Sequence, residues 1–190
     1  WFPKMQNFVK DLVKTCIECQ KVSNVSHAIR EPIHHLPPVP AFHRWSLDFI
    51  GILPETEGGN RWILTAIDHT TKWPIARAMK EATSVEVVRF IYEEILVRFG
   101  CSAEILTDRG ANFLSEMVEG YLGLQRIKHL KTSAYHPRTN GALERFNGTF
   151  GRILSRYLNN NVKLWDKFIE QALFACRVRT HKATGKSPYF

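Results

Sequence analysis

The sequence has few cysteines, no long apolar segment and fewer acids than bases. Four cysteines in 190 residues are too few for a disulfide framework, and two of them, Cys16 and Cys19, form a C-x-x-C pair. No uninterrupted apolar run approaches the ~18 residues of a membrane-spanning helix, and no signal-peptide pattern is present. We therefore expect an intracellular protein with no membrane association, in which Cys101 and Cys176 are buried and unpaired.

The shortage of acids gives the chain a strong positive charge. Lysine and arginine number 26 against 18 for aspartate and glutamate, so the net charge is +8 and the pI is near 9.5. This balance is typical of proteins that bind a polyanion such as nucleic acid, although a solvated basic face has the same composition. Between residues 126 and 156 the one acid, Glu144, stands among these bases: Arg126, Lys128, Lys131, Arg138, Arg145, Arg152 and Arg156.

Apolar periodicity divides the chain into three parts. Residues 1–26 have helical spacing that leads into Cys16 and Cys19, and residues 27–41 contain a proline cluster that predicts a linker. The rest, 42–190, contains segments typical of strands at 43–53, 61–70, 72–79, 103–108 and 126–132. Helical spacing and capping residues predict helices at about 83–99, 115–122, 141–157 and 164–178. A strand meander followed by alternating strands and helices predicts an α/β fold, with a mixed five-stranded sheet flanked by helices on both faces.

Three acids lie at informative places in this layout. Asp48 lies in the first strand, Asp108 ends a later strand, and Glu144 lies near the start of the long helix. In open α/β sheets such positions meet in one crevice, and carboxylate oxygens there are suited to hold Mg²⁺ for phosphoryl displacement. Each acid alone also fits a simpler role, as a turn or N-cap residue or as a charge that offsets the helix dipole. Asp68, which also ends a strand, is expected to be such a turn residue.

The three acids lie in three segments, WSLDFIG, LTDRGANF and HPRTNGALERFNGT, and 35 residues separate Asp108 from Glu144. These segments resemble the D,D-35-E catalytic core of retroviral-type integrases, in particular those of gypsy-type LTR retrotransposons. The first residues, WFPKM to CIECQ, resemble the second half of the zinc-binding domain that precedes this core. The resemblance implies a truncated zinc-binding segment over 1–26, a Pro-rich linker over 27–41, and a ribonuclease H-like catalytic core over 42–190 that is incomplete at its C-terminus.

The resemblance also implies a mechanism and partners. Asp48, Asp108 and Glu144 match the metal-binding triad, which holds two Mg²⁺ (or Mn²⁺) ions. The implied activity is polynucleotidyl transfer in two steps, 3′-end processing and strand transfer for DNA integration. The implied partners are element-end DNA and target DNA, with RNA as a further ligand, a homo-multimer, and the rest of a Gag-Pol polyprotein. The implied location is the nucleus, after a cytoplasmic particle stage.

Polar residues around Glu144 are expected to contact nucleic acid. In the family the loop before the long helix touches DNA ends, and the helix lies against the DNA, so the candidates are Tyr135, His136, Arg138, Asn140, Arg145, Asn147 and Arg152. Gly148 and Gly151 lie on the same helical face as Glu144, where small residues would let a DNA backbone approach. The alternative for the loop is a capped surface turn with no ligand.

Two questions stay open at this level. Cys16 and Cys19 provide two of the four ligands of a structural zinc, and the family's two histidines precede the cysteines. Zn²⁺ is therefore expected only if upstream histidines exist in a longer chain. Two rival functions also stay open: a metal nuclease of the same fold, and a non-catalytic nucleic-acid-binding remnant of a decayed or domesticated element.

Overall fold

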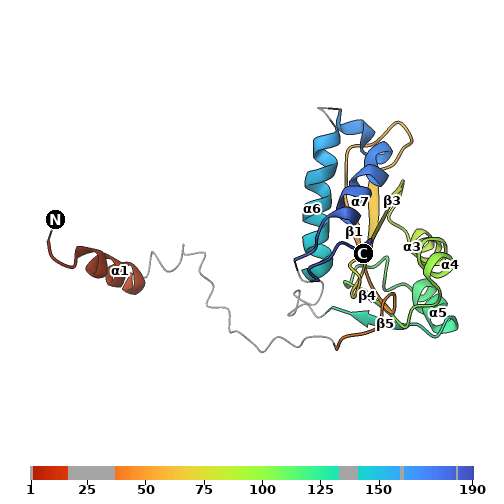
Figure 1. The fold of residues 1–190 in the computed structure, drawn as a ribbon, viewed down its shortest axis with the longest axis horizontal. Helices are drawn as coiled ribbons and strands as arrows, with labels where there is room; N and C mark the ends of the chain where they lie inside the picture. Colours follow the sequence, from red (N-terminus) through yellow and green to blue (C-terminus); the bar gives the residue numbers. More distant parts are fainter. Residues whose placement is uncertain (1, 17–36, 133–140, 159–160, 183) are drawn as a thin grey trace. The chain divides into compact units, whose positions relative to one another are not determined.

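The computed structural model describes residues 2–16, 37–132, 141–158, 161–182 and 184–190. The chain divides into two compact units, Trp1–Ile33 and His34–Phe190 (Figure 1). Most of the predicted linker and Cys19 lie outside the described residues, so the linker and the zinc-binding segment stay predictions. Over the described ranges, no helix is both long and apolar enough to cross a membrane.

The first unit contains the helix that the apolar spacing predicts, α1 (Met5–Thr15). Its last turn closes with a hydrogen bond from the Cys16 N–H to the Leu12 carbonyl at 2.9 Å. Phe8 and Leu12 are 59% and 57% exposed, so the apolar stripe of α1 is not buried within the described part of the chain.

In the described part of the second unit, five strands form one mixed sheet, as predicted. The strands lie in the order β3-β2-β1-β4-β5, and their bounds are β1 (Arg44–Ile50), β2 (Trp62–Asp68), β3 (Pro74–Met79), β4 (Glu104–Thr107) and β5 (Lys128–Lys131). β1 pairs antiparallel with β2, and β2 with β3, whereas β1 pairs parallel with β4, and β4 with β5. Pro74, which has no N–H to donate, is the first residue of an edge strand.

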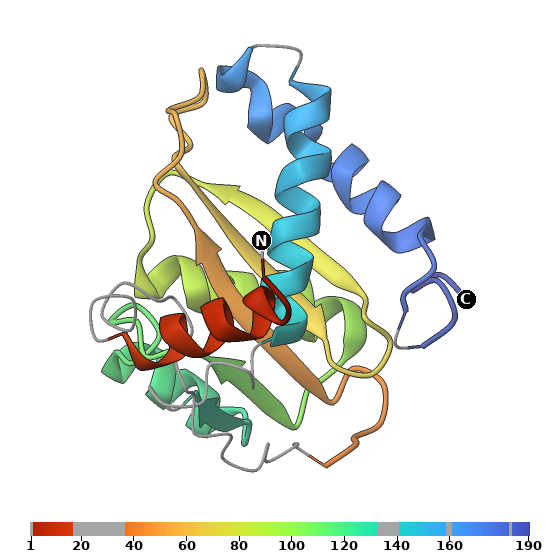
Figure 2. The ribbon, with the colours of Figure 1, turned by 90° about the vertical axis from the view of Figure 1, so that its left-hand side faces the viewer.

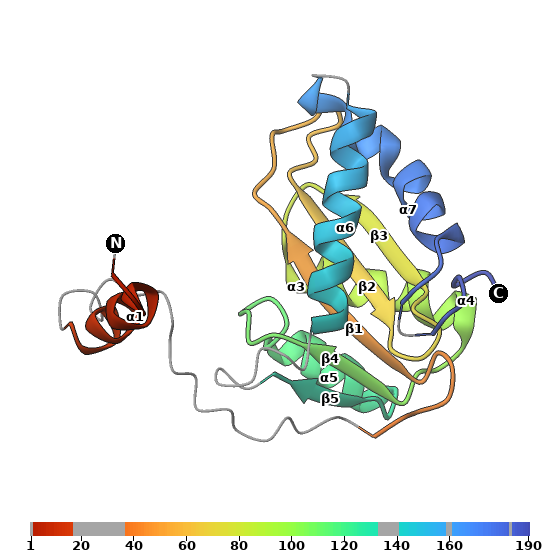
Figure 3. The same ribbon diagram turned by 60° about the vertical axis from the view of Figure 1, so that its left-hand side comes forward.

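Helices cover both faces of the sheet, which confirms the predicted layers (Figures 2 and 3). One face is covered by α3 (Ser84–Phe90), the π-helical segment η1 (Ile91–Leu96), α4 (Val97–Phe99) and α5 (Glu116–Leu124). The other face is covered by α6 (Gly141–Tyr157), the 3₁₀ segment η3 (Val162–Phe168) and α7 (Ile169–Val178). The π and 3₁₀ segments lie inside helices predicted as regular, because apolar periodicity does not separate these hydrogen-bond patterns.

A hydrophobic cluster on each face holds these layers together. Because side chains alternate across a strand, Trp45 and Leu47 of β1 pack toward α3 and η1, and Ile50 packs toward α6. On the α6 side, the apolar stripe of the helix is completed by Leu143, Phe146, Phe150 and Leu154. Asp48 lies between Leu47 and Phe49 in β1, so its side chain also points to the α6 face.

Candidate active site

The pairing of β1 with β4 brings Asp48 and Asp108 together. Arg44 lies opposite Glu104, and Ser46 lies opposite Leu106, in parallel register. Continuing this register by two residues places Asp108, just after β4, beside Asp48 near the end of β1. The convergence expected from the sequence therefore has a simple cause in the sheet.

Asp48 is held by a residue of α6. The Asn147 Nδ2 donates a hydrogen bond to the Asp48 Oδ2 at 2.9 Å. The Asn147 Oδ1 is buried and has no hydrogen-bond partner among the described residues. Glu144 is exposed and lies three residues before Asn147, so the two side chains are neighbours on one face of α6. This face of the helix looks onto the aspartates of the sheet.

Asp108 is oriented by the turn that follows β4. The Gly110 N–H donates to the Asp108 Oδ1 at 2.8 Å, and a Cβ at Gly110 would lie 3.0 Å from that oxygen. Behind the turn, the Thr107 Oγ1 donates to the Asp108 carbonyl at 2.8 Å and lies 2.8 Å from the His129 Nε2. The His129 Nδ1 lies 2.9 Å from the Glu119 Oε1. Asp108 thus stands at the end of a strand that is anchored from β5 and α5.

The charged form of Asp48 is disfavoured by its surroundings. Burial raises the pKa of Asp48 from 3.8 to about 6, and the nearby Asp108 and, more weakly, Glu144 add to this rise. The hydrogen bonds from the Phe49 backbone and from Asn147 oppose it. Within the described ranges, no three His, Cys, Asp or Glu side chains lie close enough together to hold a metal ion. Among the described residues, the three carboxylates are therefore neighbours that do not form a closed coordination shell.

The remaining sequence-predicted residues are placed as follows. Arg145 and Arg152 are exposed on α6, and a Cβ at Gly148 or Gly151 would meet no atom within 4 Å. Cys16 directly follows α1. The predicted site residues that lie outside the described residues are Cys19, Tyr135, His136, Arg138 and Asn140.

Two cysteine expectations are corrected or sharpened by the structure. Cys101 was expected to be buried, and this is wrong: it is exposed, because it follows Gly100, the residue that ends the α4 helix at the surface. Its Sγ lies 3.5 Å from the Gln125 carbonyl oxygen. Cys176 is half-buried, and burial raises the pKa of its thiol to about 11.

Sequence reasoning proposed the two aspartates as site residues but did not predict the groups that orient them. Asn147 donates a hydrogen bond to Asp48, a role that was not predicted, and its expected contact with nucleic acid stays a prediction. Gly110 was not singled out as a partner of Asp108, although an Asp followed two residues later by Gly is typical of an Asx-turn. The turn role expected for Asp68 is confirmed, since its side chain accepts hydrogen bonds from the Thr70 and Thr71 N–H groups.

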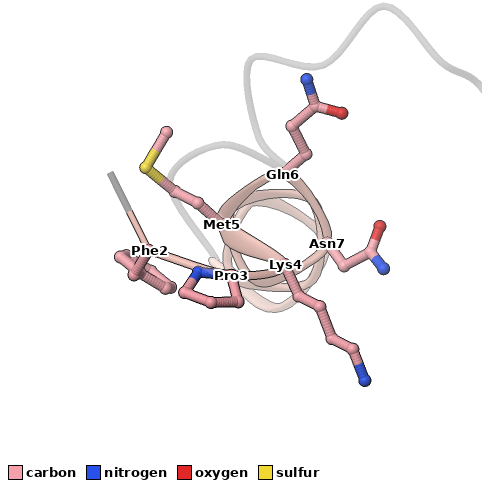
Figure 4. Close-up of a pocket in the computed structure, with 6 residues that line it drawn as sticks. All are labelled: Phe2, Pro3, Lys4, Met5, Gln6 and Asn7. Atoms are coloured by element: carbon pink, nitrogen blue, oxygen red, sulfur yellow. The ribbon is translucent and has the colours of Figure 1, made fainter.

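A pocket at the start of α1 is lined by none of the three carboxylates. Its volume is about 630 Å³, and Figure 4 shows the six consecutive residues that line it, from Phe2 to Asn7. They include one cation, Lys4, and no acid. This pocket therefore contains none of the predicted site residues and offers no carboxylate to a divalent cation.

Comparison with known proteins identifies the family. Residues 40–137, just over half of the chain, match the family model described as integrase core domain. This range contains Asp48 and Asp108, and Glu144 lies beyond it. The chain is 24% identical, over 189 residues and 100% of its length, to the retrovirus-related Pol polyprotein from transposon 412 of Drosophila melanogaster. It is 30% identical over 98% of its length to the Gag-Pol polyprotein of koala retrovirus. It spans only 15% and 11% of those two proteins.

Solved structures show the same fold. The catalytic core domain of HTLV-2 integrase in complex with magnesium aligns over 77% of this chain and 93% of that one, with a TM-score of 0.62 and 23% identity. A chain of the simian T-cell lymphotropic virus intasome aligns over 97% of this chain and 66% of that one, with a TM-score of 0.73 and 20% identity. These likenesses establish the ribonuclease H-like class of the mixed sheet and its helices. The chain belongs to the integrase core domain family, as a retroviral-type integrase of an LTR element.

Proposed function

We propose that this integrase core is a divalent-metal-dependent polynucleotidyl transferase that processes the 3′ ends of element DNA and joins them to target DNA. The observation that supports this most directly is the environment of Asp48. Its pKa is raised to about 6 by burial and by the neighbouring Asp108 and Glu144, so the site gains most from a ligand that brings positive charge. We assign Asp48, Asp108 and Glu144 as the residues that hold Mg²⁺ or Mn²⁺, two ions in all.

The donor atoms fit such cations. Asp48 and Asp108 provide carboxylate oxygens from neighbouring strands, and the buried Asn147 Oδ1, which has no partner among the described residues, adds an oxygen beside them. Oxygen ligands of this kind suit Mg²⁺ or Mn²⁺ and not a soft metal. When bound, the cations polarise a phosphoryl oxygen and favour the ionised form of an attacking hydroxyl.

The protein's own residues position the acids and the polymer. Asn147 orients the Asp48 carboxylate, and the Gly110 N–H orients that of Asp108, so both are fixed before a substrate arrives. Arg145 and Arg152, exposed on α6 near Glu144, would hold phosphates of the strand. In 3′-end processing a phosphodiester would be hydrolysed, and in strand transfer one phosphodiester would replace another. Neither step requires a covalent enzyme intermediate.

The remaining expectations belong to this proposal. The relatives are Pol and Gag-Pol polyproteins, and one similar structure is an intasome, which supports a polyprotein origin and a homo-multimer as the working form. We propose action on chromosomal DNA in the nucleus after a cytoplasmic particle stage, RNA as a further ligand, and a zinc site only in a longer chain that has the upstream histidines.

Asp108→Asn tests the assignment. Asparagine keeps the Oδ1 that accepts from Gly110 but removes the charge, so we expect Mg²⁺-dependent strand joining to fall by ~10³-fold or more, the range of several kcal/mol that metal catalysis supplies. Binding of a DNA duplex in EDTA should stay within about 3-fold of wild type, because phosphate contacts from basic residues dominate it.

Glu116→Gln is the matched control, because Glu116 is an exposed acid at the start of α5, on the other face of the sheet. It should join strands like wild type. Equal joining by Asp108→Asn and wild type would refute the triad. Cleavage without joining in the wild type would instead support the metal nuclease, and binding without either reaction would support the non-catalytic remnant.

A further inference from the structure

A second pocket, of about 430 Å³, lies beside α6 in the second unit. It is bounded by the turn between β2 and β3, the first half of α6, the end of α7 and the segment that follows α7. Its floor is apolar and includes Ile67, Pro74 and Phe146. Its lining residues include five basic ones and no acidic one: Lys72, Arg145, Arg179, His181 and Lys182.

The pocket and the carboxylates lie on different faces of α6. Arg145 and Thr149, four residues apart, both line the pocket. Glu144 and Asn147, three residues apart, belong to the face that looks onto Asp48. Consecutive residues of a helix do not face the same way, so Glu144 and Arg145 divide the start of α6 between two sites. The pocket therefore lies next to the candidate active site without being part of it.

The basic groups of the pocket lie close to one another. The pKa of Lys72 is lowered by burial; the nearby Asp68 opposes this change, and Arg145 adds a smaller lowering. The pKa of His181 is lowered first by burial and then by the charges of Lys72, Arg145 and Arg179. The charges thus repel one another across a small space. Such repulsion is relieved when an anion occupies the space.

Several cations elsewhere in the domain have acidic partners. Arg77 pairs with Glu93, Arg98 with Glu94 at 3.1 Å, and Lys167 with Glu57 at 2.9 Å. Among the described residues, no carboxylate forms an ion pair with the pocket cations Lys72, Arg145 and Arg179. The surface is therefore positive at this pocket and largely neutralised at those other positions.

Hydrogen bonds fix the walls of the pocket. The Arg177 Nη2 donates to the Pro74 carbonyl at 3.1 Å, and the guanidinium lies 4.7 Å from the centre of the Trp73 ring. These contacts tie the end of α7 to the start of β3. The Lys72 Nζ donates to the His69 carbonyl, which fixes the lysine within its turn. Among the pocket cations, Lys72 is thus held in place before any ligand binds, which lowers the entropy that its ordering would otherwise cost.

We propose that this pocket binds a phosphate group of a nucleic-acid strand, at a site separate from the carboxylates. Guanidinium groups from two elements, α6 and the segment after α7, suit the oxygens of one phosphate, and the apolar floor suits the sugar or base attached to it. The proposal rests on the proposed function in that the strand is a DNA substrate of the integrase. The pocket would hold that strand beside the site where chemistry occurs.

The test compares the salt dependence of DNA binding. The double variant Arg145→Gln/Arg179→Gln removes two pocket cations, both exposed enough to be replaced without opening the core. Binding of a short fluorescein-labelled DNA duplex is measured by anisotropy in EDTA, between about 50 and 200 mM salt. We expect the slope of log K against log salt to fall in magnitude by about 1, because the one phosphate held by both guanidinium groups contributes about 0.9 to it. Arg145→Lys/Arg179→Lys should restore most of the slope, since lysine still contacts phosphate as a point charge.

The control is Arg89→Gln/Arg98→Gln, which removes the same charge from the helices on the opposite face of the sheet. It should leave the slope within about 0.3 of wild type. An equal loss in both glutamine doubles would show an effect of net charge and overturn the proposal, as would an unchanged slope in the pocket double. Circular dichroism confirms that each variant is folded at the assay temperature. Strand joining with Mg²⁺ is scored separately, in the wild-type protein. Joining by the wild type together with an unchanged slope in the pocket double refutes only the pocket. A reduced slope in the pocket double together with no joining by the wild type refutes only the catalytic proposal.

Discussion

Asp48 and Asp68 are both acids of the first strand hairpin, yet their surroundings differ in kind. Asp68 ends β2 and is completely buried, and donors surround it: the Phe42 N–H at 3.0 Å, the Thr70 N–H at 3.1 Å, and both the N–H and the hydroxyl of Thr71. Asp48 is partly buried and has carboxylates near it, with Asn147 as its side-chain donor. Burial is therefore not what marks a functional acid in this fold.

The difference lies in the supply of donors. Both oxygens of Asp68 are occupied, the Oδ1 by Phe42 and the Oδ2 by Thr70 and Thr71, so its charge is stabilised from within the protein. The charge of Asp48 is disfavoured by burial first and then by Asp108 and Glu144, which together raise its pKa to about 6 against fewer donors. A carboxylate of the first kind organises a turn, and one of the second kind is improved by a bound cation.

The largest effect on stability should come from Asp68→Ala. The change leaves several buried donors of the turn without an acceptor, so we expect the free energy of unfolding to fall by about 2–4 kcal/mol. Urea denaturation at neutral pH measures it. Asp68→Asn should cost less, because its amide oxygen still accepts from part of the turn. A loss of less than about 0.5 kcal/mol in the alanine variant would contradict the structural role of this acid.

A smaller effect of opposite sign is expected for Asp48→Asn in metal-free buffer. Because the folded pKa is raised from 3.8 to about 6, Asp48 stabilises the fold when protonated, and this stability is lost as the pH rises through that window. Above about pH 6 the charged form destabilises the fold by on the order of 1–2 kcal/mol, after allowance for partial exposure. Asparagine has no such charge. The variant should therefore be more stable than wild type at about pH 7.5 and no more stable at about pH 4.

Thermal unfolding in EDTA at about pH 7.5 and about pH 4 distinguishes the removal of the Asp48 charge from a pH-independent change in stability. Asp68→Asn serves as the reference, because it should be less stable than wild type at neutral pH. If Asp48→Asn were destabilised at both pH values, Asp48 would resemble Asp68, and the contrast between the two acids would be wrong. The stabilised variant should also be inactive in Mg²⁺-dependent strand joining, since the charge that weakens the fold is the charge proposed to hold the metal.

Much of this contrast follows from local sequence. The turn role of Asp68 was predicted from the DHTTK pattern, and the convergence of the triad was predicted from strand ends and a helix start. The five strands and the long helix were predicted because their patterns are local. The Thr83 cap is also local: its Oγ1 accepts from the Glu86 N–H at 3.4 Å.

The parts that sequence did not predict depend on contacts between distant segments. Asn147 and Asp48 are 99 residues apart, and no local pattern pairs an amide on one helix with an acid on one strand. The basic pocket combines Lys72, Arg145 and Arg179 from three segments, and its existence depends on how α7 packs beside α6. The exposure of Cys101 depends on where a helix ends at the surface, which composition does not specify.

The smallest expected effect tests whether the surroundings of Asp48 are open to DNA as well as to a cation. Gly148 follows Asn147 on α6, and a Cβ there would meet no atom within 4 Å. Gly148→Ala should therefore stabilise the helix by about 0.5–1 kcal/mol, since glycine is a poor helix former. Gly120→Ala on α5 is the matched control, because that position is also open but lies on the other face of the sheet. Both variants should gain similar stability in urea denaturation. If the DNA backbone approaches Gly148 and Gly151, strand joining should fall only in Gly148→Ala. Unchanged joining in Gly148→Ala would mean that these glycines are exposed but that the open side of Asp48 serves the cation and not a closely approaching DNA backbone.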